Sequence, residues 1–201
     1  MEPFVVVLAA ALGSGGFAAI LKTIQWFVDR RRVNEVNLVK ELVDVNKTYE
    51  ILTDAKNKTK ASRVSLIRLH NGGGRPVAGK PMYSSGIYEV YSDGKHPIAK
   101  YWQNERVDTD EQYRQMLIEM FDKEMVCIET TSMKQGKLKE LYDYQNVFRS
   151  HVRKVGKRGD DFFYISATFE EPYADDKQKS RENVEMRVMV NRLKEILHIE
   201  D

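Results

Sequence analysis

The sequence predicts an α+β domain that lies behind a transmembrane helix and a helical stalk. Two observations support this prediction. After residue 61, short stretches that are apolar, or that alternate apolar with polar residues, are bounded by glycine-containing turns. Between them lie amphipathic segments with the period of a helix. Before it, an uncharged run is followed by a long segment without proline or glycine. The predicted boundaries are 1–32 for the anchor, 33–61 for the stalk and 62–201 for the domain.

Composition restricts the function more than it defines it. The 201 residues include 32 basic and 30 acidic side chains, so the net charge is +2 and predicts no nucleic-acid partner. A single cysteine excludes an intramolecular disulfide framework and fits a reducing compartment. With 42% hydrophobic and 10% aromatic residues, the chain has enough apolar side chains for a real core.

The N-terminal segment predicts an association with the lipid bilayer. Phe4–Leu21 is eighteen residues without a charge, which reaches the lower limit for a membrane span. Arg30–Arg32 ends the segment, and the positive-inside rule then places the following domain in the cytoplasm as part of a single-pass protein. A buried helix of a soluble protein is one alternative. A cleaved signal peptide is another, although no basic residue precedes the apolar run. Small residues four apart (Ala11, Gly15 and Ala19) favour self-association in the membrane.

The stalk, Val33–Lys60, has the periodicity of a coiled coil. Its apolar residues are spaced by alternating steps of four and three, which predicts a homodimer or a larger homo-oligomer. This seam consists of Leu38, Leu42, Val45, Tyr49 and Leu52. Further apolar residues, among them Ile51, broaden the stripe, so the helix is also expected to pack on the following domain.

The domain is expected to begin with a central strand, Arg63–Leu69, that runs into the glycine-rich turn His70–Gly74. Val64 and Leu66 share one face of this strand, while Ser65, Ile67 and Leu69 share the other. The remaining expected elements are the strand Gly86–Ser92 with an Asp93-Gly94 turn, the helix Glu111–Lys123, the strand Met125–Thr131, helical spacing over Leu138–Val152, the strand Phe162–Phe169, and a closing helix Asp176–His198.

Three of these stretches resemble a GAF domain, a small-molecule sensor fold. They are the amphipathic helix that leads into RVSLIRLHNGG, the late strand FFYISATFEEPY and the closing helix, so the resemblance covers about Lys56–Leu197. The resemblance implies a central antiparallel sheet with helices on one face, a pocket on the other, and dimerisation through the terminal helices. The chain lacks the Asn-Lys and Asp-Glu set of cyclic-nucleotide-binding members. Cys127 is followed by Ile128 rather than by the histidine usual at a bilin-attaching cysteine. Neither ligand is therefore expected.

Several residues are candidates for ligand contact. Gly74–Lys80 matches a phosphate-binding loop, but Pro81 stands where a Mg²⁺-binding hydroxyl is needed, so the segment is interpreted as a loop that lodges at most an anion. His70 is more simply explained as capping the glycine turn, and Cys127 as a buried, inert thiol. The ligand-binding candidates are His70, Asn71, Arg75, Lys80, Tyr88 and Cys127. No catalytic set, metal site or cofactor is predicted.

These observations favour a membrane-anchored, GAF-like sensory or interaction module that binds a small ligand or a partner protein on the cytoplasmic side. The alternative is a membrane-assembly or holin-like structural protein whose soluble domain docks partners. An enzyme is not expected, because no nucleophile, base and orienting group can be assembled. The basic run Arg153–Arg158 fits a patch for phosphate or anionic lipid, but a solvated turn is the favoured interpretation.

Overall fold

The computed structural model describes residues 22–26, 37–72, 77 and 79–200. The chain divides into two compact units, Met1–Val45 and Asn46–Asp201. In the first unit, residues 22–26 and 37–45 are helical. The predicted membrane span Phe4–Leu21 and its Arg30–Arg32 flank lie outside the described residues. Within the described residues, no helix is both long and apolar enough to cross a membrane.

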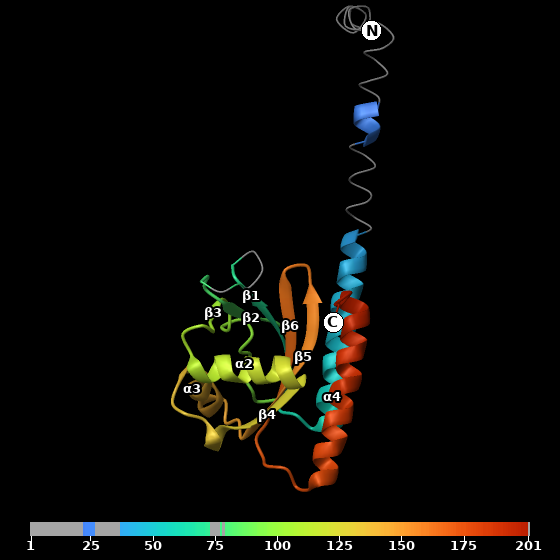
Figure 1. Ribbon diagram of the computed structural model, residues 1–201. Coiled ribbons are helices and arrows are strands. Elements are labelled where there is room, and N and C mark those ends of the chain that lie inside the picture. The colour runs from blue at the N-terminus through green and yellow to red at the C-terminus, as the bar shows by residue number, and fades with distance from the viewer. Residues whose placement is uncertain (1–21, 27–36, 73–76, 78, 201) are drawn as a thin grey trace, which may run out of the picture. The chain divides into compact units, whose positions relative to one another are not determined.

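The second unit is built on one six-stranded antiparallel sheet with the order β3-β2-β1-β6-β5-β4 (Figure 1). The central position predicted for the first strand is confirmed, since β1 pairs with β2 on one side and β6 on the other. The strands are β1 (Arg63–His70), β2 (Tyr83–Tyr91), β3 (Glu105–Arg106), β4 (Met125–Glu129), β5 (Arg149–Arg158) and β6 (Asp161–Phe169).

Helices cover both faces of this sheet, whereas the family resemblance implied helices on one face only. On the first face lie the helical residues 46–59 and α4 (Asp176–Leu197), which run side by side (Figure 1). The side chains buried between these helices and the sheet include Ile51, Leu52, Val64, Leu66, Phe163, Ile165, Met186, Val190 and Leu193. The apolar face of α4 is therefore covered inside the domain.

The second face is covered by two shorter helices, α2 (Glu111–Lys123) and α3 (Lys137–Tyr144). The bounds of α2 agree with the prediction, and its side chains Met116, Leu117 and Met120 are buried. The core on this side also includes Leu69, Tyr113, Leu138, Tyr142, Val152 and Tyr164. Ile67 and Leu69 of β1 contact this core, whereas Val64 and Leu66 contact the α4 side, as the alternation predicts.

The prediction of one helix over Leu138–Val152 is wrong in its second half. α3 ends at Tyr144 and the chain enters β5 at Arg149. The interpretation of Arg153–Arg158 as a solvated turn is also wrong, because these residues lie in β5. The strand was not predicted because one of its faces carries charged side chains, so its sequence does not show the alternation of apolar and polar residues typical of a strand. Arg149, His151 and Arg153 are nevertheless buried.

The C-terminal end of α4 is held against β5 by a close backbone approach. Lys157 and Glu200 exchange two backbone hydrogen bonds of 2.7 Å each. Gly156 lies at a bulge with φ of +149°, and a Cβ there would overlap the Glu200 carbonyl oxygen. Glycine is thus required where the end of the chain meets the sheet.

Candidate functional site

A cavity of about 50 Å³ lies between the sheet and the pair α2–α3. Its walls are mostly apolar and come from α2, α3, the sheet and the segment after β2. These apolar side chains are Ile67, Ile98, Trp102, Met116, Leu138, Leu141 and Val152. A concave apolar site with a few polar groups is the usual form of a small-molecule pocket.

Hydroxyl groups of the sheet form the polar part of this cavity. Ser65 of β1 and Ser166 and Thr168 of β6 contribute their side chains to its lining, and all three are buried. Ser166 Oγ lies 3.0 Å from Ser150 Oγ. The lining therefore offers both donors and acceptors to a ligand atom.

Three buried tyrosines surround the same space. The hydroxyl groups of Tyr113 and Tyr164 are hydrogen-bonded to each other. Burial raises the pKa of Tyr113 to about 12 and the pKa values of Tyr142 and Tyr164 above their ordinary range. All three phenols are consequently neutral at physiological pH and act as uncharged hydrogen-bonding groups.

Arg63 lies at one end of the cavity, where its charge is already matched. Its Nε is 2.9 Å from Glu89 Oε1, and a terminal nitrogen donates to the His96 carbonyl oxygen at 2.6 Å. Glu89 also accepts from the backbone nitrogens of Ile98 and Ala99, at 2.9 and 3.0 Å. One carboxylate thus neutralises the arginine and fixes the cavity wall.

That wall approaches β2 closely at Gly86. A Cβ on Gly86 would lie 2.8 Å from the Ala99 Cα, and the Gly86 nitrogen donates to the Trp102 carbonyl oxygen at 2.8 Å. Trp102 Nε1 in turn donates to Ser84 Oγ at 2.8 Å. The segment around Ala99–Trp102 is therefore seated directly on the strand.

Asp110 joins the two helices that close the cavity. Its Oδ1 accepts from the Tyr113 nitrogen at 3.0 Å, as the N-cap of α2, and its Oδ2 accepts from the Leu138 nitrogen at 3.2 Å near the start of α3. The free amide groups at both helix starts are satisfied by one side chain.

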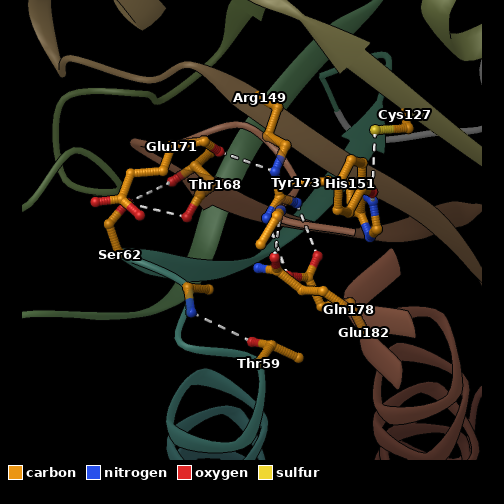
Figure 2. Close-up of polar contacts among 12 residues, drawn as sticks. Thr59, Ser62, Cys127, Arg149, His151, Thr168, Glu171, Tyr173, Gln178 and Glu182 are labelled. Atoms are coloured by element: carbon orange, nitrogen blue, oxygen red, sulfur yellow. Dashed lines mark hydrogen bonds and ion pairs between the residues drawn. The ribbon is translucent and has the colours of Figure 1, made fainter. Parts of the chain in front are cut away.

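A second polar cluster lies on the opposite face of the sheet, against α4 (Figure 2). Arg149 is 1% exposed and forms two hydrogen bonds with Glu182, of 2.7 and 2.9 Å. Its guanidinium carbon lies 3.8 Å from the ring centroids of both Phe169 and Tyr173, and its Nε donates to the Glu171 carbonyl oxygen at 3.0 Å. The arginine is thus enclosed and fully paired.

His151 lies next to this ion pair and is also 1% exposed. Its Nε2 is hydrogen-bonded to the Tyr173 hydroxyl, which lies 3.4 Å from Cys127 Sγ (Figure 2). Burial lowers the His151 pKa to about 4, helped by the positive charges of Arg149, Lys179 and Arg153. Burial raises the Cys127 pKa, which agrees with an inert thiol.

The predicted ligand-binding residues are not brought together. His70 Nε2 is 2.9 Å from Ser85 Oγ and its Nδ1 accepts from the Gly72 nitrogen at 3.1 Å, so His70 caps the glycine turn. Asn71 follows it directly. Tyr88 packs on the α4 side against Tyr49, with ring centroids 5.5 Å apart. Lys80 is exposed, Cys127 contacts Tyr173 on the α4 face, and Arg75 lies outside the described residues.

The cavity residues were missed because each looks ordinary in the sequence. Ser65 and Ser166 stand inside apolar strands, which is the signal that polar groups face a packed interior. Tyr113 and Tyr142 lie on amphipathic helices, where an aromatic residue indicates core packing. Only the strand pairing, which sets Ser65 opposite Ser166, shows that they share one site.

Comparison with known proteins gives a fold and no sequence family. No protein-family profile and no curated protein matches this chain. A solved structure, the photoproduct state of GAF3 from Slr1393 of Synechocystis sp. PCC6803, covers 77% of this chain and 96% of its own with a TM-score of 0.53. The chain has a GAF-like fold.

The sequence identity to that structure is 8%, so the likeness extends to the fold alone. Two further neighbours have TM-scores of 0.49. One is a far-red cyanobacteriochrome photoreceptor, which is 11% identical over 82% of this chain and 98% of its own. The other is a GAF domain/HD domain protein from Geobacter sulfurreducens, which is 8% identical over 76% of this chain and 95% of its own.

Proposed function

We propose that this chain is a sensory module that binds a small, uncharged ligand in the cavity between the sheet and α2–α3. The observation that carries the proposal is an apolar cavity whose polar groups are buried serine, threonine and tyrosine hydroxyls. The GAF-like fold supports it, since GAF3 from Slr1393, which shares this fold, was solved in a photoproduct state. The role is that of a binding module rather than an enzyme.

The cavity chemistry favours a neutral ligand. Arg63 is paired with Glu89, and the tyrosines are neutral because burial raises their pKa values. A charged ligand would lose its hydration without gaining an unpaired opposite charge. The hydroxyls instead favour a ligand with one or two hydrogen-bonding atoms.

The cavity volume limits the ligand further. At about 50 Å³ it is far below the roughly 300–1,000 Å³ of sites for drug-sized molecules. A tetrapyrrole chromophore is too large for it. Cys127 also lies on the opposite face of the sheet, so a ligand in the cavity has no thiol to bond to covalently.

The ligand would act on the elements that close the cavity. Glu89 and Gly86 fix the wall segment, and Asp110 couples the starts of α2 and α3. If these elements have two conformations, a ligand that binds one of them more tightly shifts the population towards that conformation.

We further propose that the chain is anchored in a membrane and forms a homodimer. The support for both is the pattern of apolar residues in the sequence and the exposure of apolar side chains. The uncharged Phe4–Leu21 supports a single-pass anchor with a cytoplasmic domain. Leu38, Val39, Leu42 and Val43 are exposed on the helical residues 37–45, and Leu42 is 55% exposed, which supports self-association there. Carbonate extraction of membranes from expressing cells tests the anchor: release of the full chain into the wash contradicts it. The membrane-assembly alternative stays a prediction of the sequence.

The ligand site is tested with phenol, a small ring with one hydroxyl group. We expect millimolar binding that shifts the backbone amide NMR signals of Ile67, Val152 and Ser166 in the full chain. Leu141→Trp fills the cavity from α3 and should abolish these shifts. Tyr144→Trp, on the exposed face of the same helix, should leave them unchanged.

Two results would contradict the proposal. One is no phenol-dependent shift in the unmodified chain at millimolar phenol. The other is an equal response in Leu141→Trp, which would place the binding elsewhere. The NMR spectrum of each variant without phenol shows whether its fold is intact.

A further inference from the structure

A groove on the α4 side of the sheet has a strong positive charge. It has a volume of about 380 Å³ and is lined by β5, the residue before β4 and the second half of α4. Its charged lining consists of Arg153, Lys154, Arg187 and Lys194 against the single carboxylate of Glu124. The groove does not share the cavity's lining residues and lies on the other face of the sheet.

Arg153 is the deepest of these cations, with 7% of its surface exposed. Its NH1 donates to Asn183 Oδ1 at 2.8 Å and lies 3.5 Å from Met125 Sδ, so both contacts are neutral. Across the described part of the chain, no ion pair involves Arg153, Lys154 or Arg187. A buried guanidinium group without a carboxylate partner is costly unless an anion neutralises it.

The electrostatics agree with this geometry. Burial lowers the Arg153 pKa, and the nearby positive charge of Arg187 lowers it further, whereas Glu124 acts in the opposite direction. The protein therefore holds two guanidinium groups close enough to repel each other. Such convergence is expected where both groups face a shared anion.

We propose that this groove is a binding site for a phosphate monoester, with Arg153 as its buried anchor and Arg187 and Lys194 beside the phosphate. Several cations against one carboxylate suit a dianion better than a singly charged carboxylate. The guanidinium fork matches the oxygen geometry of phosphate. The volume leaves room for the group that the phosphate carries.

The first test uses glycerol 3-phosphate as the probe and the full chain as the protein. Arg187→Gln removes an exposed charge at the groove, and Arg181→Gln removes an exposed charge elsewhere on α4. We expect Arg187→Gln to weaken binding roughly tenfold by calorimetry, and Arg181→Gln to leave it within roughly twofold. Binding should also weaken as sodium chloride is added.

Two outcomes would overturn the proposal. One is no saturable binding of glycerol 3-phosphate to the unmodified chain. The other is an equal loss of affinity in Arg187→Gln and Arg181→Gln, which would reduce the effect to overall charge. Neither outcome bears on phenol binding in the cavity, so the two proposals fail separately.

The same titration distinguishes a dissolved phosphate ester from a lipid headgroup. It is repeated with vesicles of phosphatidylcholine, with and without phosphatidic acid. If the groove accepts the phosphate of a lipid, phosphatidic acid competes and raises the apparent Kd in an Arg187-dependent way. An unchanged Kd assigns the site to a dissolved phosphate monoester.

Discussion

The two ends of the contact between β5 and α4 each bury an arginine, but within the described residues only one of these arginines has a carboxylate partner. Arg149 meets Glu182 through two hydrogen bonds and is covered by two aromatic rings. Arg153 lies on the same face of the strand but meets Asn183, the neighbour of Glu182, through one neutral hydrogen bond. One end of the contact is closed on itself, and the other is left positively charged.

This difference separates a structural arginine from a candidate binding residue. A buried charge is stable in the fold when its partner belongs to the same chain, as Glu182 does for Arg149. Arg153 differs, because the charged group that faces it from α4 is Arg187, which has the same sign. The negative charge that would neutralise Arg153 can then come from a bound anion. Burial alone does not distinguish the two. The identity of the facing residue does.

The largest expected effect on stability comes from removing the ion pair between Arg149 and Glu182. Glu182→Ala leaves the Arg149 guanidinium group buried without its partner, which should lower the free energy of unfolding by about 3–5 kcal/mol. Urea denaturation of the full chain measures this. Glu185→Ala, on the same helix, removes a longer 3.7 Å ion pair with Lys58 and should cost at most about 1 kcal/mol.

A loss for Glu182→Ala no larger than for Glu185→Ala would mean that the two rings and the Glu171 carbonyl oxygen hold Arg149 by themselves. A double replacement sharpens the point. Arg149→Met combined with Glu182→Leu removes both charges together and should recover most of the stability that Glu182→Ala loses.

The second effect is a pH dependence that originates at His151. Its pKa is about 4 in the fold, below the ordinary value of 6.5, so the unfolded chain takes up a proton at higher pH than the folded one. Stability is therefore complete above about pH 6.5 and is lost as the pH falls towards 4, by about 3 kcal/mol in total. The groups facing His151 are Arg149, Arg153, Lys179, Tyr173 and Cys127.

Urea denaturation between pH 7 and pH 4 isolates this contribution when His151→Gln is compared with the unmodified chain. The unmodified chain should lose more stability over that range than His151→Gln does. His70 acts in the same direction, because burial lowers its pKa too, and it remains in both proteins. His198→Asn, at the exposed C-cap of α4, serves as the control and should follow the unmodified chain. Identical slopes for His151→Gln and the unmodified chain would contradict the assignment.

The sequence-based prediction was accurate for elements whose buried residues form a regular apolar pattern along the chain. β1 was placed at the centre because both of its faces carry apolar residues, and α2 was found to the residue. The GAF-like fold followed from three such patterns, and the structural neighbours support it. Local pattern is sufficient where the buried residues are apolar.

The prediction failed where burial depends on a distant partner. The sequence of β5, RSHVRKVGKR, is rich in arginine, histidine and lysine, so it reads as polar. Arg149 is buried only because Glu182, 33 residues later, faces it. No spacing rule connects those two positions. The cavity was missed for the same reason, since its hydroxyls meet only through strand pairing.

The stalk shows a third case, in which the periodicity is real but its partner is not specified. Of the predicted seam, Leu52 is fully buried in the core of its own domain. Leu38 and Leu42 are exposed. Steps of three and four state that a helix face is apolar, and they do not state what covers it.

The smallest expected effect tests the open end of the comparison directly. Arg187→Gln removes the positive charge that repels Arg153, so without phosphate it should raise the free energy of unfolding by about 0.2–0.5 kcal/mol, the size of a like-charge pair on a helix surface. High salt should abolish the gain because exposed charges are screened. Arg181→Gln should show no such gain. If Arg187→Gln instead destabilises the domain, Arg187 contributes to the fold like Arg149 does, and the contrast between the two ends disappears. A small gain, together with weaker binding of glycerol 3-phosphate by the same variant, is the expected behaviour of a residue whose charge serves a ligand rather than the fold.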